Sequence, residues 1–263
     1  MSHTNGDPIA VNKQFYSTYW GRAWKYRLMY DMQIKRKWFM HAIRRAGLST
    51  STQRVLDVGF GSGDILFEFD KSCVISGVDY SQTAVDIARR RAESGGYNGP
   101  DFSRLDLDGG ALPFPDAGFD VVVCSHVLEH VADDSQLIDE ICRVLSARGA
   151  AVLLVPINEK PFEEPNHVRQ YTTAQFLEVL GRHNLQTCFV KECEHLSPLF
   201  QFFFRRQLNR RGFGLGLVVS GMINVPLALL PLSVHSLIDR LMGSWGVLPR
   251  QCVVVAVKQT RGC

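Results

Sequence analysis

The sequence lacks a clear excess of charge of either sign. Its 29 Lys and Arg residues are nearly balanced by 26 Asp and Glu residues, which leaves a net charge of +3. Proteins that bind nucleic acid through its phosphates usually carry a marked basic excess or a basic face. The balance therefore argues against nucleic acid as the general partner.

Paired cysteines and a secretory leader are also missing. The seven cysteines are an odd number, contain no CxxC pair and are scattered through the chain. They indicate no disulfide framework, and several lie in predicted strands, as buried thiols do. The first 14 residues, MSHTNGDPIAVNKQ, contain no apolar h-region. We therefore expect a cytoplasmic protein.

Apolar residues, by contrast, are plentiful. The chain has 263 residues, of which 46% are hydrophobic. This is enough for one large α/β core, with material left for an insertion. The composition is that of one enzyme-sized domain.

The most informative stretch is VLDVGFGSGD, residues 55–64. It runs from an apolar strand into a glycine turn and then into an apolar run, which is typical of a strand, a tight loop and a helix. Glycines at 59, 61 and 63 let the backbone approach a ligand closely, and the expected helix points its first N–H groups there. A GxGxxG dinucleotide motif would need glycine where Asp64 stands. The motif is GxGxG instead, with Asp57 before it, and a carboxylate there suits a ligand with an ammonium group.

Acidic residues then recur at the ends of predicted strands. The strand 73–78 leads to Asp79, about 20 residues after the glycines, where a carboxylate can bind a ribose diol. Tyr80 follows and could stack on an adenine ring. Asp106 comes after a short strand, and the strand 119–124 leads to Ser125.

These four motifs, in order and spacing over about residues 50–157, resemble the class I S-adenosylmethionine-dependent methyltransferases, whose first motif is DxGxGxG. The resemblance implies an α/β fold with a Rossmann-like, seven-stranded, mostly parallel sheet and an antiparallel last strand. It also implies S-adenosylmethionine as cofactor, with the acidic residue at the Asp106 position contacting the adenine amino group. The expected cofactor contacts are Tyr16, Tyr19, Asp57, Gly59, Gly61, Ser62, Gly63, Asp79, Tyr80, Asp106, Leu107, Ser125 and His126.

The N-terminal region combines aromatic and basic residues. We expect a disordered tail over residues 1–12 and one or two amphipathic helices over residues 13–46. The aromatic rings either form a lid that faces a cationic sulfonium or pack against the sheet. The segment FYSTYW resembles the FYxxxW of many such enzymes, in which a tyrosine reaches the cofactor carboxylate; Tyr16 and Tyr19 are the candidates.

The stretch RVLSARGAAVLLVP, residues 143–156, resembles the family's helix, turn and fifth strand, and a second candidate site lies after it. Thr172 with Gln175 three residues later reads as a capping box, which predicts a helix to about Arg182. His167, Arg169 and Tyr171 precede it, at the carboxyl edge where ligands bind in open α/β sheets. Related methyltransferases carry a similar HxRxY stretch on the acceptor side; a solvated surface loop is the alternative. The expected substrate contacts are Glu129, Arg169, Tyr171, Phe202 and Phe203.

The expected chemistry is modest. Methyl transfer from a sulfonium is an in-line displacement, so the site must align the acceptor, exclude water and remove a proton from a hydroxyl nucleophile. Imidazole suits the last task because its pKa lies near working pH. His130 and His167 are therefore the candidate catalytic bases. This mechanism requires no metal, and we predict none.

The segment HVLEH also matches the HxxEH pattern of some zinc peptidases, with His126 and His130 one helical turn apart. A zinc hydrolase would need a helix around His126 and a further ligand downstream. The preceding VVVC run instead places His126 at a strand end. In the resembling family a similar LEH segment borders the cofactor. The hydrolase is therefore a remote alternative.

An insertion separates the last two predicted strands, 185–192 and 251–258. It contains an uncharged run over residues 212–234 that includes Pro226 and Pro231. The run is long enough to cross a membrane, but a single crossing would put the last strand on the wrong side from its sheet. The remaining interpretations are a helical cap over a greasy acceptor, a dimer surface, or an interfacial element. In the last case Arg205, Arg206, Arg210 and Arg211 would meet anionic headgroups.

We therefore expect a methyltransferase core over residues 47–196 and 251–263, an N-terminal tail and lid over residues 1–46, and a hydrophobic helical insertion over residues 197–250. The expected activity is transfer of a methyl group to a small, lipophilic acceptor, with O-methylation favoured over C- or N-methylation. A membrane-embedded lipid or quinone is the alternative acceptor. Homodimerisation and peripheral membrane contact through residues 197–250 are further hypotheses. A non-catalytic cofactor-binding partner protein is the remaining alternative.

Overall fold

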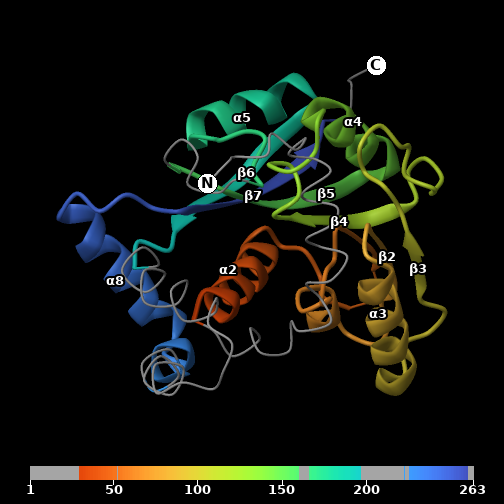
Figure 1. Ribbon diagram of the computed structural model, residues 1–263, viewed down its shortest axis with the longest axis horizontal. Helices are drawn as coiled ribbons and strands as arrows, with labels where there is room; N and C mark the ends of the chain where they lie inside the picture. Colours follow the sequence, from red (N-terminus) through yellow and green to blue (C-terminus); the bar gives the residue numbers. More distant parts are fainter. Residues whose placement is uncertain (1–29, 52, 160–165, 197–221, 223–224, 260–263) are drawn as a thin grey trace, which may run out of the picture.

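The computed structural model describes residues 30–51, 53–159, 166–196, 222 and 225–259. Its centre is a seven-stranded sheet with the strand order β3-β2-β1-β4-β5-β7-β6 and helices on both faces (Figure 1). The strands are β1 Arg54–Val58, β2 Val74–Asp79, β3 Asp101–Arg104, β4 Phe119–Ser125, β5 Leu145–Pro156, β6 Leu185–Cys193 and β7 Gln251–Lys258. The helices are α2 Tyr30–Arg45, η2 Leu66–Glu68, α3 Gln82–Gly95, α4 Asp134–Val144, α5 Thr173–Arg182 and α8 Leu232–Ser244.

The direction of the strands confirms the predicted sheet. Strands β1 to β5 pair in parallel, whereas β7 runs antiparallel to both β5 and β6. The strand order reverses between β1 and β4, so the carboxyl ends of these two strands form the switch point of the sheet. Ligands of open α/β sheets bind at such a point.

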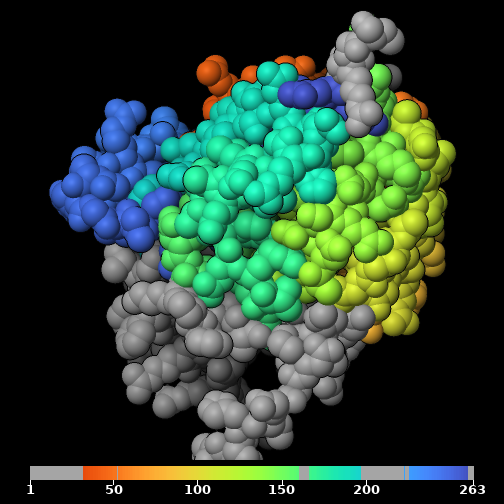
Figure 2. Space-filling view, turned by 90° about the horizontal axis from the view of Figure 1, so that it is seen from above, coloured from red at the N-terminus to blue at the C-terminus, as the bar shows by residue number. Residues whose placement is uncertain are grey.

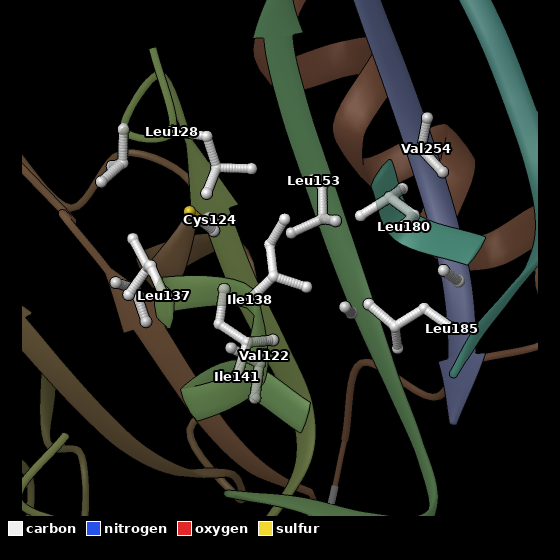
Figure 3. Close-up of a cluster of buried hydrophobic side chains, with 14 of the residues drawn as sticks. Val122, Cys124, Leu128, Leu137, Ile138, Ile141, Leu153, Leu180, Leu185 and Val254 are labelled. Atoms are coloured by element: carbon white, nitrogen blue, oxygen red, sulfur yellow. The ribbon is translucent and has the colours of Figure 1, made fainter. Parts of the chain in front are cut away.

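The core consists of two apolar layers, one on each face of the sheet. Successive strand residues point to opposite faces, so Val55 packs with α2 and α3, whereas its neighbour Leu56 packs with α4 and α5. Figure 3 shows the second layer, in which Ile138 and Ile141 of α4 meet side chains of the central strands. Strands buried on both faces read as continuous apolar runs. This explains the VVVC and VLLV stretches.

Local capping signals place the helices. The Thr172 side chain accepts from the backbone N–H of Gln175, and the Gln175 side chain accepts from the N–H of Thr172, so the predicted capping box at the start of α5 is confirmed. Asp133 caps α4 in the same manner, accepting from the N–H of Gln136 at 2.9 Å. Such caps satisfy N–H groups that the helix itself leaves unpaired.

The expected helix after the glycine loop is wrong. Only η2, a three-residue 3₁₀ turn, follows the loop. Phe69 at its end is extended and buried in the core, and the N–H of Asp70 already bonds the carbonyl of Thr50. The chain must return to the sheet at Val74, which leaves too few residues for an α-helix. The loop therefore presents its own amides rather than the N-terminus of a helix.

Helix α2 covers the face formed by β5, β6 and β7 (Figure 1). Trp38 is 4% exposed and Phe39 is fully buried in the same apolar layer as Val55. Of the two predicted alternatives, these two aromatic residues pack against the sheet and do not form a lid. Residues 13–29 of the expected lid lie outside the described part of the chain.

Helix α8 protrudes at one side of the molecule (Figure 2). The Lys37 ammonium of α2 donates to the carbonyls of Ala228 and Leu230, which ties this region to the core. Several large apolar side chains here are exposed: Leu229, Leu237, Leu241, Trp245 and Leu248. Among the described residues, no helix has the length and apolar character that a membrane crossing requires. The division of the chain into lid, core and insertion stays a prediction.

Candidate active site

The glycine loop joins the carboxyl end of β1 to the rest of the site. Its three glycines have φ angles of +73°, +54° and +72°, a region that strongly favours glycine. A Cβ on Gly59 would lie 2.3 Å from the Cγ2 atom of Val127, and one on Gly63 would lie 2.7 Å from the Phe67 ring. The loop therefore packs directly against the segment that follows β4. Loss of glycine here would strain the backbone and disturb that segment.

Asp79 holds the loop from the end of β2. Its Oδ2 accepts the N–H of Gly61 and its Oδ1 accepts the N–H of Ser81, both at 2.8 Å. The side chain is buried. Burial raises the pKa of Asp79 to about 6, although the two backbone hydrogen bonds act in the opposite direction. The carboxyl is thus fixed in position and costly to keep charged.

Asp57 is the second buried carboxyl at this edge. Burial raises its pKa well above the ordinary value, and the neighbouring charge of Asp79 raises it further. Buried carboxyls need donors or cations to be stable in the charged form. An ammonium group and a pair of hydroxyls, as S-adenosylmethionine carries, would satisfy both residues. The chemistry of the donor set therefore fits that cofactor.

Arg91 of α3 braces the loop from outside, and sequence reasoning missed it. Its guanidinium donates to the carbonyl of Ser62, forms an ion pair with Asp64 at 3.2 Å and lies 4.3 Å from the centre of the Phe67 ring. The Ser62 hydroxyl donates to Asp64 as well. Three consecutive arginines occupy positions 89–91, so the sequence carries no signal for which one faces the loop.

The expected adenine contacts lie at the ends of β2 and β3. The Arg104 guanidinium lies 5.2 Å from the centre of the Tyr80 ring and so stacks near one face of it. Asp106 is exposed and accepts the N–H of Asp108, while Leu107 packs against the core. The fold brings Tyr80, Asp106 and Leu107 to the edge of the sheet that carries Asp79. Tyr16 and Tyr19 lie outside the described residues.

Ser125 ends β4, and His126 turns the chain away from the sheet. His126 has a φ of +56°, and its N–H donates to the carbonyl of Leu154. The next residues form a turn, closed by a bond from the N–H of His130 to the carbonyl of Val127. No helix surrounds His126 in this described segment, which removes the condition that the zinc hydrolase alternative needs.

Three histidines surround the fully buried Glu129. His126 Nδ1 lies 3.0 Å from Glu129 Oε1, and His130 Nε2 lies 3.9 Å from the same oxygen. Because the carbonyl of Asn166 can only accept, His130 Nδ1 must donate to it, at 2.9 Å. Burial lowers the pKa of His130, and the Glu129 charge opposes this in part. His130 therefore favours the neutral form.

His167 reaches the same place from the loop after β5. Its ring centre lies 4.8 Å from that of His130, and its Nδ1 lies 2.6 Å from Glu159 Oε2. The backbones also join, since the N–H of Val168 donates to the carbonyl of Glu129. The two predicted catalytic histidines thus lie side by side. Glu159 was missed, although its position after β5 at the carboxyl edge could have indicated it.

Arg169 and Tyr171 have internal partners. The Arg169 guanidinium donates to the carbonyls of Leu128, Val131 and Ala132 and lies 3.5 Å from Asp134. The hydroxyl of the buried Tyr171 donates to Asp134 at 2.6 Å. These contacts clamp the loop after β5 onto the turn after β4. Their expected role in binding substrate stays a prediction. Phe202 and Phe203 lie outside the described residues.

Comparison with known proteins agrees with this geometry. Residues 56–153 match a family described as a methyltransferase domain. The ubiquinone/menaquinone biosynthesis C-methyltransferase UbiE of Geobacter sulfurreducens is 34% identical over 128 residues, which cover 46% of this chain and 48% of that protein. The chain spans about half the length of the curated relatives it matches.

Solved structures show the same fold. The [4+2]-cyclase SpnF superposes with a TM-score of 0.60 at 20% identity, covering 86% of this chain and 81% of its own. The phosphoethanolamine N-methyltransferase 2 of Haemonchus contortus, in complex with S-adenosyl-L-methionine, superposes with a TM-score of 0.57 at 17% identity, covering 85% of this chain and 53% of its own. The family match, the fold and the buried carboxyls at the strand ends agree on S-adenosylmethionine as cofactor. Residues 56–153 therefore match a methyltransferase domain, and the fold and strand-end motifs around them are those of the class I S-adenosylmethionine-dependent methyltransferases.

Proposed function

We propose that this protein transfers a methyl group from S-adenosylmethionine to a hydroxyl oxygen of a small, lipophilic acceptor. One observation carries the proposal: the glycine loop with Asp79 and the pair His130 and His167 share one edge of the sheet. Val127 connects them, because it packs on Gly59 and stands three residues before His130. A methyl donor and a proton acceptor would thus be neighbours.

The cofactor residues divide into three groups by chemistry. When bound, S-adenosylmethionine supplies an electrophilic methyl group on a sulfonium. Asp79 would accept hydrogen bonds from the ribose diol, and Asp57 would offset the charge of the ammonium. Tyr80 offers a ring for adenine, with Arg104 on one face already. Loop amides of residues 59–63 approach closely because no side chain intervenes.

His167 is the stronger candidate for the base. Glu159 lies 2.6 Å from its Nδ1 and so orients the ring. The Nε2 atom is then the proton acceptor. His130 lacks a carboxylate on Nδ1, because that nitrogen donates to a backbone carbonyl. A proton taken from the acceptor would stay on His167 Nε2, while Glu159 keeps its hydrogen bond with Nδ1.

The apolar surface of the insertion supports a lipophilic acceptor. Trp245 and Leu229 are each 76% exposed. Asn158 lies just after β5, next to Glu159 of the site. Its side-chain amide donates to the carbonyl of Pro249, which attaches the end of the insertion to the site. A greasy acceptor or a membrane surface could therefore meet the protein on this side. Cytoplasmic location, peripheral membrane contact and a homodimer stay predictions.

A membrane-embedded lipid or quinone is the second candidate acceptor. The relatives named as ubiquinone/menaquinone biosynthesis C-methyltransferases favour it. Attack by a ring carbon of a hydroquinone would also gain from removal of a hydroxyl proton, so His167 would serve either outcome. The atom that receives the methyl group distinguishes the two.

The test is a transfer assay with isotopically labelled cofactor and a lipid extract. Labelled product identified by mass spectrometry and NMR would show whether oxygen or carbon carries the methyl group. The Gly61→Val variant is the matched control, because it should not retain the cofactor. Binding of S-adenosylmethionine without transfer to any fraction would favour the non-catalytic partner protein instead.

A further inference from the structure

The described residues bring together a set of side chains that methyl transfer alone does not require: Glu129, His130 and His167. One ring nitrogen of each histidine and one carboxylate oxygen of Glu129 lie within 4.8 Å of one another. Glu129 and His130 belong to the turn after β4, and His167 to the loop after β5. Imidazole nitrogen and carboxylate oxygen are ligands that Zn²⁺ and related cations use.

Both histidines are oriented by their second nitrogen. His130 Nδ1 donates to the carbonyl of Asn166 at 2.9 Å, and His167 Nδ1 donates to Glu159 Oε2 at 2.6 Å. In the neutral rings the lone pair is then on Nε2. Histidines that bind metals usually donate their other N–H to a carbonyl or carboxylate, which sets the tautomer and the ring orientation. Both rings are therefore arranged as Nε2 ligands.

Glu129 lacks a sufficient set of partners for a buried carboxylate. The side chain is fully buried, and its Oε1 lies 3.0 Å from His126 Nδ1. Within the part of the chain that the structure describes, its Oε2 has no hydrogen-bond donor. An unpaired buried carboxylate oxygen is costly. A cation beside Glu129 would remove that cost, and His126 would hold the carboxylate in place.

We propose that Glu129, His130 and His167 bind one divalent first-row transition cation, of the Zn²⁺ or Fe²⁺ type. Two imidazoles and one carboxylate form a three-ligand set that leaves a position open for a further oxygen ligand. Tetrahedral ligation at about 2.0–2.1 Å would bring the ligand atoms to about 3.3 Å from one another. Small side-chain rotations suffice to reach this from the present spacing. Two nitrogen ligands disfavour Mg²⁺ and Ca²⁺.

The open position gives the site its functional meaning. Metal binding itself is independent of the proposed function. The identity of the further ligand rests on the proposed function, which makes that ligand the hydroxyl oxygen of the acceptor. A cation there would lower the pKa of that hydroxyl. With a cation bound, His130 and His167 would act as metal ligands, in place of the role as base that is proposed above for His167.

Calorimetry with Zn²⁺ on tag-free, metal-stripped full-length protein tests the proposal. All proteins carry Cys188→Ser, since Cys188 is an exposed thiol that could bind Zn²⁺ by itself. The ligand variants are Glu129→Gln and His167→Ala, with Glu159→Gln as the variant of a residue that only orients a ligand. The matched control is His183→Ala. The Asp139 carboxylate lies 2.6 Å from His183 Nδ1, as Glu159 does from His167, but His183 lies outside the cluster.

One equivalent of Zn²⁺ should bind to the parent and to His183→Ala. The ligand variants should bind at least 100-fold more weakly, and Glu159→Gln about 10- to 100-fold more weakly. Co²⁺ spectra should show nitrogen and oxygen ligation without thiolate. Circular dichroism checks that each variant folds. If a ligand variant does not fold, His130→Gln or His167→Gln is measured in its place.

Absence of a bound equivalent in the parent, or equal affinity in the parent and the ligand variants, overturns the proposal. S-adenosylmethionine binding and methyl transfer are measured separately on the metal-stripped protein. Transfer by the metal-stripped protein, combined with no bound Zn²⁺ in the parent, would leave the proposed function intact while the metal site falls. Metal binding without methyl transfer would support the metal site and would count against the proposed function.

Discussion

The backbone N–H of Gly61 donates to Oδ2 of Asp79 at 2.8 Å, across 18 positions of sequence. This bond connects the loop after β1 to the end of β2 at the switch point of the sheet. The residue expected to bind the ribose also shapes the glycine loop. Changes at either residue should therefore affect the same ligand.

Replacing Asp79 by Asn or Gly61 by Val should weaken S-adenosylmethionine binding at least tenfold, about 1.4 kcal/mol. The first change removes a carboxylate that can accept from two hydroxyls, and the second places a branched side chain at a positive φ in the loop. Calorimetry measures the effect. Asp70→Asn, an exposed position in the turn before β2, is the control. Unchanged affinity in both variants would remove the basis of the cofactor assignment to these residues.

Asp79 should make stability depend on pH between about 4 and 6. Its pKa rises from 3.8 to about 6 on folding, so the folded chain holds the proton more tightly. The contribution favours folding below pH 4 and is lost as the pH rises through 6. The stability lost between low and neutral pH amounts to about 3 kcal/mol. Urea unfolding of the cofactor-free protein should show that this pH dependence is smaller in Asp79→Asn. Parallel curves for the two proteins would contradict the prediction.

Gly59→Ala should destabilise the protein more than Gly96→Ala. Both glycines have φ near +74°, but only at Gly59 would the new methyl group meet an atom, Val127 Cγ2 at 2.3 Å. The backbone cost is about 1–2 kcal/mol at each site, and the clash adds roughly 1–3 kcal/mol. Adding Val127→Ala to Gly59→Ala should recover part of the loss. A double-mutant cycle with no coupling energy would argue against the contact.

His167→Ala should lower the rate of methyl transfer at saturating cofactor by roughly 10² or more. The affinity for S-adenosylmethionine should stay nearly unchanged, because the Asp79 contacts are not involved. His130→Ala is measured in parallel, and His183→Ala is the control. Losses of only a few-fold in both active-site variants would make these histidines bystanders and would favour a nucleophile that needs no base.

The apolar side chains of α8 should contribute to binding of anionic liposomes if the insertion is interfacial. Flotation should decrease when Leu237, Leu241 and Trp245 are replaced by Ser, whereas Val190→Ser on β6 should have no effect. Salt should weaken flotation, because electrostatic attraction is screened over about 10 Å at 0.1 M. Neutralising Arg205, Arg206, Arg210 and Arg211 should weaken it as well. A protein that never floats, and whose acceptor range is unaffected by these changes, would make the insertion scaffold or dimer contact.

The fold was largely predictable because it depends on short-range patterns. Successive residues of a strand point to opposite faces, which separates Val55 from Leu56, and polar residues end β2 and β4 at Asp79 and Ser125. The capping box at Thr172 is a local signal as well. The missing helix after the glycine loop was not predictable from its apolar residues, because the length of the return path to β2 decided it.

The sequence by itself determined the strand ends and hence the edge at which chemistry can occur. Only the tertiary structure decided which side chains meet there. Glu129 and Glu159 are 30 positions apart, yet Glu129 lies beside His130 and Glu159 beside His167 at the same place, because β4 and β5 are neighbours in register, with Ser125 beside Leu154. Continuous apolar runs specify the strands that are buried on both faces, but the paths of the loops beyond the strand ends follow from packing and hydrogen bonds between distant segments. Arg169 illustrates this, because no pattern in the sequence indicates that its guanidinium bonds three backbone carbonyls.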